Sequence, residues 1–238
     1  MRALSHADFL SLWEAGHGLH SLDRGVLAAT ALLPEASQDN VADWTLGRRN
    51  EALARLHARH FGSSLGGWTE CEGCGEKLEF AVDCRGLIER QRERNVTPVE
   101  VKGQAFRVPT SRDLARIADE ADAEDAARRL AALCRMDAGD QREWAGEWSN
   151  TELAELGEKM SAADPLAEIL LQFACPACGA VREQALDLPG FLWAELEAFA
   201  KRMLAEIHML ASAYGWSESE ILALSDRRRA AYVQMVRG

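Results

Sequence analysis

Cys71-Glu72-Gly73-Cys74 is followed at once by Gly75, and Cys175-Pro176-Ala177-Cys178 is followed at once by Gly179. A tight turn with this spacing can present two thiolates to one metal ion, so each stretch is typical of a metal-binding knuckle. One hundred residues, positions 75 to 174, separate the two pairs. The sequence therefore predicts that Cys71, Cys74, Cys175 and Cys178 hold one structural Zn2+, with everything between the pairs forming an insertion.

The two pairs have an alternative interpretation as disulfide-bonded or redox-active thiols. A redox Cys-x-x-Cys opens a helix after a strand, whereas both pairs here run into segments of strand character, 77–82 and 180–186. The separation of the pairs is nevertheless much longer than the roughly 15 to 20 residues of a compact ribbon. Zinc is the favoured interpretation. Cys84 and Cys134 lack this spacing and are interpreted as small packing residues.

The composition indicates a globular protein with an acidic surface. Hydrophobic residues make up 47% of the 238, which is enough for one large domain or two small ones. The 27 basic and 38 acidic residues give a formal net charge of −11, which opposes binding to a phosphate backbone. No stretch reaches the roughly 18 to 20 apolar residues of a membrane span, and no long apolar run opens the chain. We expect no nucleic-acid partner, no membrane association and cytoplasmic folding with reduced thiols.

Hydrophobic periodicity and helix-capping signals divide the chain into five parts. These are an N-terminal helical region (1–62), the first half of a zinc ribbon (63–86), a mixed hairpin and helical insertion (87–165), the second half of the ribbon (166–188) and a C-terminal helical unit (189–238). We expect an α+β fold that is mostly helical, built around a split four-cysteine zinc ribbon.

The N-terminal region contains three predicted helices. They cover residues 5–15, 22–33 and 46–61, and their predicted caps are Ser5, Ser21 and Thr45. The stretch 34–40 between the second and third helices is expected to be a loop, because it begins at a proline and is rich in polar residues.

The insertion combines a predicted hairpin with short helices. Residues 99–101 and 105–108 are strand-like and are joined through Lys102-Gly103. Helices are predicted from 87 to 94, after the capping pair Thr110 and Asp113, from 126 to 134, and from 152 to 160 with Asn150 or Thr151 as its start.

Two stretches of the insertion are irregular. The acidic run 119–125 is interpreted as a solvated helix start, with a specific basic partner as the alternative. The segment 137–150 is the least regular part of the chain, and its Trp144 and Trp148 suggest a loop that docks on another surface.

The C-terminal unit begins with the longest predicted helix, 191–214, which follows a turn at Pro189-Gly190 and stops at Gly215. Two short helices capped by Ser217 and Ser225 complete it. Interfaces favour Trp, Tyr and Arg, so the candidate partner-binding residues are Tyr214, Trp216, Arg227, Arg228, Arg229 and Tyr232. The alternative is that these side chains pack back on the long helix.

Nothing in the sequence indicates catalysis. It contains no glycine-rich phosphate loop, no dinucleotide fingerprint, no nucleophile elbow and no cysteine–histidine nucleophile setting. A zinc with four cysteine ligands also has no open position at which to activate water. The pairs His57-x-x-His60 and His17-x-x-His20 lack a carboxylate motif and are interpreted as packing or surface residues. We therefore expect a binding or assembly protein with no small-molecule substrate.

Several further stretches carry a family resemblance. They are Leu46-Gly47-Arg48-Arg49-Asn50, Phe61-Gly62, the first knuckle with Leu78-Glu79-Phe80, the stretch 106–114, the second knuckle, Phe191-Leu192-Trp193, and the C-terminal stretches 206–210, 214–222 and 224–232. Together they resemble the zinc-ribbon baseplate proteins encoded in gene clusters of contractile phage tails and phage-tail-like contractile injection systems.

The resemblance implies a structural or assembly component of the baseplate or its hub. Its partners would be other baseplate or tail proteins, and the family supplies no catalytic residues. The protein would either remain in a phage-tail-like particle or act only as an assembly chaperone.

A rival interpretation is a zinc ribbon that binds nucleic acid or regulates transcription through Arg227 to Arg229. Such a protein would present a basic face with aromatic residues on its ribbon strands. The predicted strands and their flanks are instead acidic, with Glu76, Glu79, Asp83, Glu183 and Asp187. We rank this interpretation second.

Overall fold

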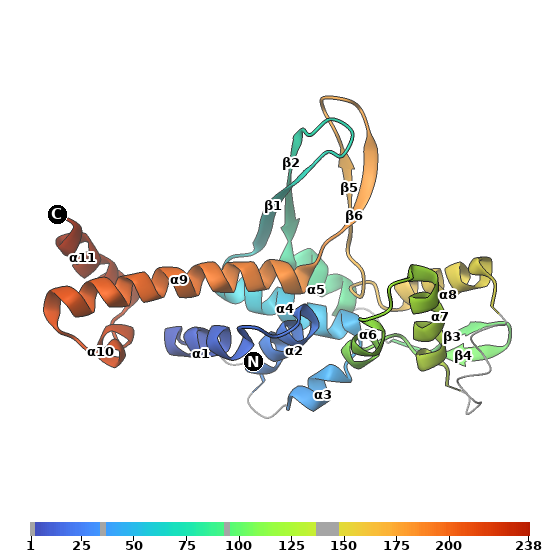
Figure 1. Ribbon diagram of the computed structural model, residues 1–238, viewed down its shortest axis with the longest axis horizontal. Helices are drawn as coiled ribbons and strands as arrows, with labels where there is room; N and C mark the ends of the chain where they lie inside the picture. Colours follow the sequence, from blue (N-terminus) through green and yellow to red (C-terminus); the bar gives the residue numbers. More distant parts are fainter. Residues whose placement is uncertain (1–2, 34–36, 93–95, 137–147) are drawn as a thin grey trace.

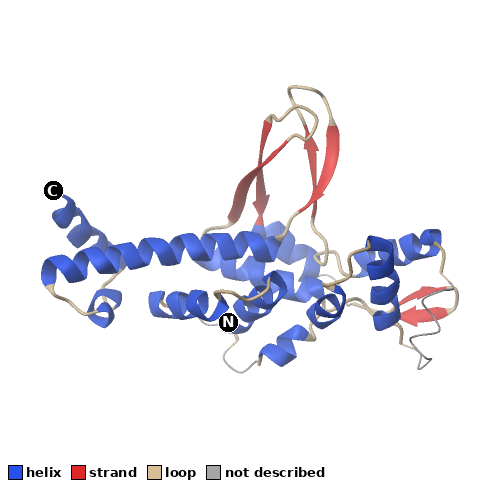
Figure 2. Ribbon diagram, viewed as in Figure 1, coloured by secondary structure: helices blue, strands red, loops and turns tan. Residues whose placement is uncertain are grey.

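The computed structural model describes residues 3–33, 37–92, 96–136 and 148–238, which form an α+β fold that is mostly helical (Figures 1 and 2). A long helix runs along a helical body, and two β-hairpins project side by side from that body (Figure 1). A small unit formed by the insertion lies at the end of the molecule opposite the C-terminus. Of the described helices, none combines the length and hydropathy required to cross a membrane.

The described residues of the N-terminal region, 3–33 and 37–62, form α1 (His6–Gly16), α2 (Ser21–Ala31), α3 (Gln38–Ala42) and α4 (Leu46–His60). The predicted caps Ser5 and Thr45 are confirmed. The predicted cap Ser21 is wrong, because His20 Nδ1 accepts the Leu22 N–H at 3.3 Å and the helix begins at Ser21 itself. The helix α3 also replaces part of the expected loop, since Ser37 caps it.

The projecting hairpins are β1 (Ser64–Glu70) with β2 (Lys77–Asp83), and β5 (Leu170–Ala174) with β6 (Val181–Ala185). Both pairs are antiparallel. The sequence did not predict β1, because Gly66 and Gly67 weaken a strand pattern. Gly67 leaves room for the Phe80 ring, since a Cβ atom would lie 2.6 Å from Cζ of Phe80 on the paired strand and the ring would have to shift.

The insertion forms α5 (Cys84–Arg92), β3 (Val99–Val101), β4 (Gln104–Phe106), α6 (Ser111–Ile117), α7 (Ala123–Cys134) and α8 (Asn150–Ala163). The predicted hairpin of β3 and β4 and the Thr110–Asp113 capping box are confirmed. The predicted start of α5 at 87 is wrong, because the helix begins directly after β2. The start of α8 is close to the predicted one, but its cap is Ser149.

The structure tests the predictions for the two irregular stretches of the insertion to different extents. The acidic run opens α7, with Asp122 as the N-cap and Glu124 and Asp125 in the first turn, as expected for a solvated helix start. Trp148 is buried and packs edge-on against Phe106 at 5.4 Å between ring centroids, so it docks inside the protein. Trp144 lies outside the described residues.

The C-terminal unit consists of α9 (Leu188–Tyr214), α10 (Glu218–Leu222) and α11 (Asp226–Arg237). The predicted turn at Pro189-Gly190 is wrong, because Asp187 caps α9 and Pro189 lies in its first turn, where a missing N–H costs nothing. The predicted stop at Gly215 is confirmed, with φ of 69°. Ser217 and Ser225 cap the two short helices as expected.

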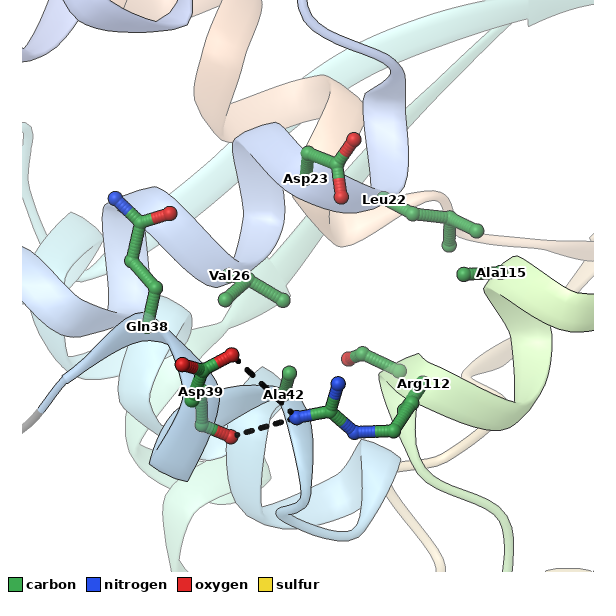
Figure 3. A pocket seen from close by; sticks show the side chains of 9 residues that line it. Leu22, Asp23, Val26, Gln38, Asp39, Ala42, Arg112 and Ala115 are labelled. Carbon is green, nitrogen blue, oxygen red and sulfur yellow. Dashed lines mark hydrogen bonds and ion pairs between the residues drawn. The ribbon is translucent and has the colours of Figure 1, made fainter.

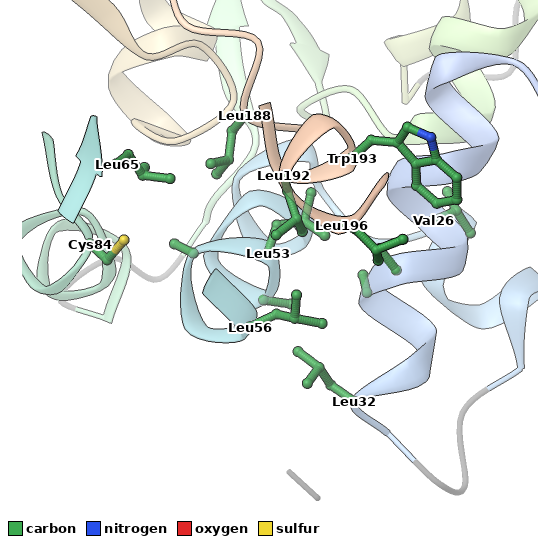
Figure 4. Close-up of a cluster of buried hydrophobic side chains, with 14 of the residues drawn as sticks. Val26, Leu32, Leu53, Leu56, Leu65, Cys84, Leu188, Leu192, Trp193 and Leu196 are labelled. Carbon is green, nitrogen blue, oxygen red and sulfur yellow. The ribbon is translucent and has the colours of Figure 1, made fainter. Parts of the chain in front are cut away.

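The main hydrophobic core lies between α2, α4 and α9 (Figure 4). Leu53 and Leu56 of α4 meet Leu192 and Leu196 of α9 there, and all four are almost completely buried. Leu65, at the start of β1, and Cys84, just after β2, belong to the same cluster. The base of the first hairpin is thus anchored in the main core. A separate cluster joins β3, β4, α7 and α8, so the insertion has its own small core.

Candidate metal centre

The four predicted ligands meet at the tip of the two hairpins. The Sγ atoms of Cys71 and Cys178 are 3.7 Å apart, and those of Cys74 and Cys175 are 3.6 Å apart. All four lie within 4.8 Å of one another. Four sulfurs around a tetrahedral ion at about 2.3 Å would be separated by about 3.8 Å. The thiols therefore fit a tetrahedral metal ion, and each short distance joins one hairpin to the other.

The two knuckles have the same backbone design. In the first, the Cys71 N–H donates to the Glu76 carbonyl at 2.8 Å and the Gly75 N–H donates to the Cys71 carbonyl at 2.7 Å. In the second, Cys175 donates to Ala180 and Gly179 donates to Cys175, both at 2.9 Å.

Glycine is required to close each turn. Gly75 has a φ of 76° and Gly179 a φ of 73°, in the left-handed region that glycine enters without the steric cost of a Cβ atom. The glycine after each cysteine pair, read from the sequence, thus has a direct conformational reason.

The backbone of the second knuckle favours a thiolate. The Cys178 and Ala177 N–H groups donate to the Cys175 sulfur and lower its pKa to about 7. At Cys74 the backbone N–H of Glu76 acts in the same direction, but hydrogen bonds with the neighbouring thiols outweigh it and raise the pKa to about 12. Thiols packed this closely cannot all ionise together without a cation, and thiolates are the form that binds metal.

Few other interactions hold the tips of the hairpins together. Phe80 and Phe173 meet edge-on with 6.0 Å between ring centroids, and Arg182 pairs with Glu72 at 2.8 Å. The buried residues of this small cluster are Cys71, Leu78, Phe173 and Cys175. The ion pair between the knuckles was not predicted, because the sequence gives no register between segments so far apart. A cluster of this size cannot fix two hairpins without a further crosslink.

The arrangement suits a structural metal better than redox chemistry. A redox pair lies at a helix N-terminus, where the helix dipole stabilises its thiolate. Here the first pair leads into β2 and the second into β6. Across residues 3–33, 37–92, 96–136 and 148–238, the four cysteines are also the one group of thiol, imidazole and carboxylate side chains that meets in a metal-like cluster.

A second arrangement, of Cys84, His57 and Glu195, was not predicted, because the three residues are far apart in the sequence. It has the residue types of a nucleophilic site, but solvent does not reach its thiol or its imidazole. His57 Nδ1 lies 3.5 Å from Cys84 Sγ and 2.9 Å from the Gly62 carbonyl oxygen. His57 Nε2 lies 3.2 Å from Glu195 Oε2, without hydrogen-bond geometry. Cys84 is 0% exposed and His57 1%, and burial raises the pKa of the Cys84 thiol. The cluster has a structural role, because it connects α4 to the start of α5 and to α9.

The other predicted histidines also have structural positions. His17 is exposed, and the exposed His20 caps α2. His60 is partly buried, where its Nε2 accepts the Leu4 N–H at 3.4 Å and its ring packs against Phe9. These positions agree with the interpretation of both pairs as packing or surface residues.

The candidate partner-binding residues of the C-terminal unit divide into an aromatic group and an arginine group. Trp216 stacks on Tyr214 at 4.7 Å and meets Tyr232 edge-on at 4.8 Å, both between ring centroids. Trp216 and Tyr232 are partly buried against a core of α9, α10 and α11, whereas Tyr214 is 40% exposed. Arg227 and Arg228 are exposed.

Arg229 is buried and so does not belong to the exposed basic patch with Arg227 and Arg228 that the sequence predicts. It is only 5% exposed, and it pairs with Glu206 at 2.9 Å and Asp226 at 3.0 Å. Its Nη1 also lies 3.2 Å from His6 Nδ1. Arg229 therefore joins α11 to α9 and α1 inside the fold, because a buried guanidinium must be paired.

A shallow hollow of about 210 Å3 lies between α2, α3 and α6 (Figure 3). Arg112 extends across it towards Asp39 and binds Asp43 at 2.7 Å. The two partners are exposed acids, so the hollow is a polar seam between the N-terminal region and the insertion. It presents no reactive group.

Comparisons with family models, with curated proteins and with solved structures give no match for this chain. The geometry of the four-cysteine site and the sequence itself are therefore what indicate the function of the protein.

Proposed function

We propose that this protein is a non-enzymatic structural or assembly component of the baseplate of a contractile tail or contractile injection system. In this proposal Cys71, Cys74, Cys175 and Cys178 bind a structural Zn2+ and form a split zinc ribbon. The observation that carries it is the meeting of four thiols within 4.8 Å of one another. They belong to the knuckles of the two hairpins that project from the helical body in Figure 1. A zinc with four protein ligands holds a shape and leaves no position for substrate.

The exposed side chains of the hairpins support a protein partner. Trp68 is 57% exposed, Leu170 53% and Val181 64%. Large exposed apolar groups that lie close together are typical of protein-binding surfaces, and Trp is among the residues most enriched at the energetic centres of such surfaces. The family resemblance of the sequence supplies the baseplate as the assembly in which such a partner is found.

The alternative function is that of a zinc ribbon that binds nucleic acid. The net negative charge of this protein argues against that function. We expect no retardation of DNA or RNA in a gel at physiological salt with protein on the order of 1 µM, because acidic side chains repel the phosphate backbone. A salt-dependent shift below that concentration would contradict the assembly proposal and favour a regulator.

Deletion of the gene in its own host tests the proposed function. We expect contractile particles to be absent or to lack a complete baseplate in electron micrographs, with assembly restored by the wild-type gene. Cys175→Ser should restore little assembly, because the hairpins lose a metal ligand. Cys134→Ala alters a buried cysteine far from the site and is the matched control, expected to restore assembly. Normal particles in the deletion strain would contradict the proposal.

A further inference from the structure

A groove of about 280 Å3 lies between the two hairpins and the start of α9. Trp68 and Thr69 of β1 line it from one hairpin, and Gln184 and Ala185 of β6 line it from the other. Phe191, in the first turns of α9, also lines it. The groove is smaller than the roughly 300 to 1,000 Å3 of small-molecule sites. Its size suits one or two side chains of a protein partner.

The strands that line the groove have free edges. Within the described residues, β1 pairs only with β2, and β6 pairs only with β5. Each two-stranded sheet therefore leaves backbone N–H and C=O groups that an added strand can pair with. An extended peptide binds such an edge through its backbone and places alternate side chains in adjacent pockets.

Four of the side chains that line the groove are aromatic. Phe80 of β2 and Phe173 of β5 line it together with Trp68 and Phe191. Aromatic faces attract both aliphatic side chains and cations. Lys77 Nζ lies 5.3 Å from the centroid of the Trp68 ring, a contact of the second kind within the protein itself.

The charge of the hairpins selects a basic partner. The acidic residues of 64–83 and 170–187 are Glu70, Glu72, Glu76, Glu79, Asp83, Glu183 and Asp187, and the basic residues are Lys77 and Arg182. Both bases already have acidic partners, in Glu79 and Glu72. Among the described residues, Glu70, Glu76 and Glu183 form no ion pair, and all three are exposed. Four thiolates around one Zn2+ would add further negative charge.

We infer that this groove binds an extended segment of a partner protein in which basic residues alternate with aliphatic ones. The aliphatic side chains enter the aromatic groove, the basic ones meet Glu70, Glu183 and Asp187, and the backbone pairs with a free strand edge. The inference deepens the proposed function, because it specifies the chemistry of the partner. A second copy of this acidic chain is disfavoured by like charge, and so is nucleic acid.

A short synthetic peptide in which lysine alternates with valine tests the groove directly. Added to the zinc-loaded full chain, it should shift backbone amide resonances at 67–69, 184–187 and 191. We expect a dissociation constant on the order of 100 µM at about 50 mM salt, and weaker binding at about 500 mM salt. A peptide in which glutamate alternates with valine should cause no shifts. Absence of shifts with the lysine peptide, or shifts elsewhere on the protein, would overturn the inference.

Two variants separate specific docking from general charge attraction. Glu70→Lys with Glu183→Lys should weaken binding of the lysine peptide about tenfold or more. Glu14→Lys with Glu158→Lys changes two exposed acids of α1 and α8, adds the same charge and should leave binding unchanged. Ala185→Trp fills the groove from an exposed position and should also weaken binding about tenfold.

If Ala185→Trp binds the peptide like the wild type, the acidic surface acts alone and the groove is not the site. Analytical ultracentrifugation tests for self-association, and a dimer lost in Ala185→Trp would replace the inferred partner with a second copy. These outcomes are independent of the gene-deletion result. The proposed function can therefore fail while the groove still binds peptide, and the reverse also holds.

Discussion

Replacement of Cys175 by serine, or removal of the metal by a strong chelator, is expected to unfold the paired hairpins while the helical body stays folded. A four-cysteine zinc contributes on the order of 10 kcal/mol of apparent binding free energy, and the small cluster at the tip cannot replace it. Elemental analysis should find one zinc per chain in the wild type and little in Cys175→Ser. Hydrogen exchange should show lost protection in 66–82 and 171–185.

The structure limits how much of the chain should unfold when a metal ligand is lost. With the two knuckles at either end of the insertion, loss of a ligand is expected from the sequence to loosen the whole middle of the chain. The structure instead gives the insertion its own core and places the base of the first hairpin in the main core. We therefore expect the helical circular dichroism of the body to survive loss of the metal.

Cys84→Ala is the matched control for the metal prediction. Cys84 is fully buried below the hairpins, so the change should lower stability by a few kcal/mol or less but leave one zinc per chain. Two results would contradict the metal site: protein purified without chelator that contains no zinc, or hairpin amides that keep their protection after strong chelation.

The parts of the fold that the sequence predicted are those with local causes. A Cys-x-x-Cys-Gly turn requires only a few consecutive residues, so both knuckles were recognisable despite their separation. The capping boxes at Ser5, Thr110 and Ser217 are local in the same sense, because the cap and its partner are three residues apart. That the two knuckles meet was predictable only through the chemistry of a shared metal ion.

The parts that the sequence did not predict depend on contacts between distant residues. The strand β1 contains Gly66 and Gly67, and the rings of Phe80 and Phe191 pack against Gly67, a contact that the local sequence does not reveal. Arg229 lies in an exposed-looking run of arginines, but Glu206, His6 and Asp226 draw it into the interior. Neither the strand pairing that places Phe80 against Gly67 nor the acidic partners of Arg229 can be derived from composition alone.

Leu46-Gly47-Arg48-Arg49-Asn50, one of the stretches that carry the family resemblance, also has a structural explanation. Asp164 is fully buried and accepts the Gly47 N–H at 2.8 Å and a Gln91 side-chain N–H at 2.7 Å. Asn50 donates to the Leu166 carbonyl at 2.7 Å. These bonds fasten the end of the insertion to α4, just before the chain enters the second hairpin. They therefore help to set where Cys175 and Cys178 lie.

Arg49 completes this buried polar network. Its guanidinium donates to Asn50 Oδ1 at 2.9 Å and to the Ser111 hydroxyl at 3.0 Å. Burial lowers the pKa of Arg49 to about 10, which still leaves it charged at neutral pH. Gln91 Oε1 is already buried without a hydrogen-bond partner among the described residues, so the loss of a further bond would leave a second polar group unsatisfied in the interior.

Gly47→Ala is expected to be among the most destabilising single methyl additions in the chain. The new Cβ would lie 1.9 Å from Asp164 Oδ1, so the carboxylate must move and its hydrogen bonds to Gly47 and Gln91 must lengthen or break. Overpacking together with a buried carboxylate that loses donors should cost about 3 kcal/mol. Urea unfolding followed by circular dichroism measures the change, and the melting temperature should fall by about 6 to 12 °C.

Gly157→Ala is the matched control, because Gly157 is exposed within α8 and a Cβ there meets no atom within 4 Å. The same chemical change should stabilise the protein by about 0.5–1 kcal/mol through the helix propensity of alanine. The opposite signs of the two changes separate the buried contact from any general effect of replacing glycine in a helix. If Gly47→Ala instead matches the wild type in stability, the Asp164 carboxylate has moved and replaced its two hydrogen bonds with others at no cost. The network would then not be what positions the second hairpin.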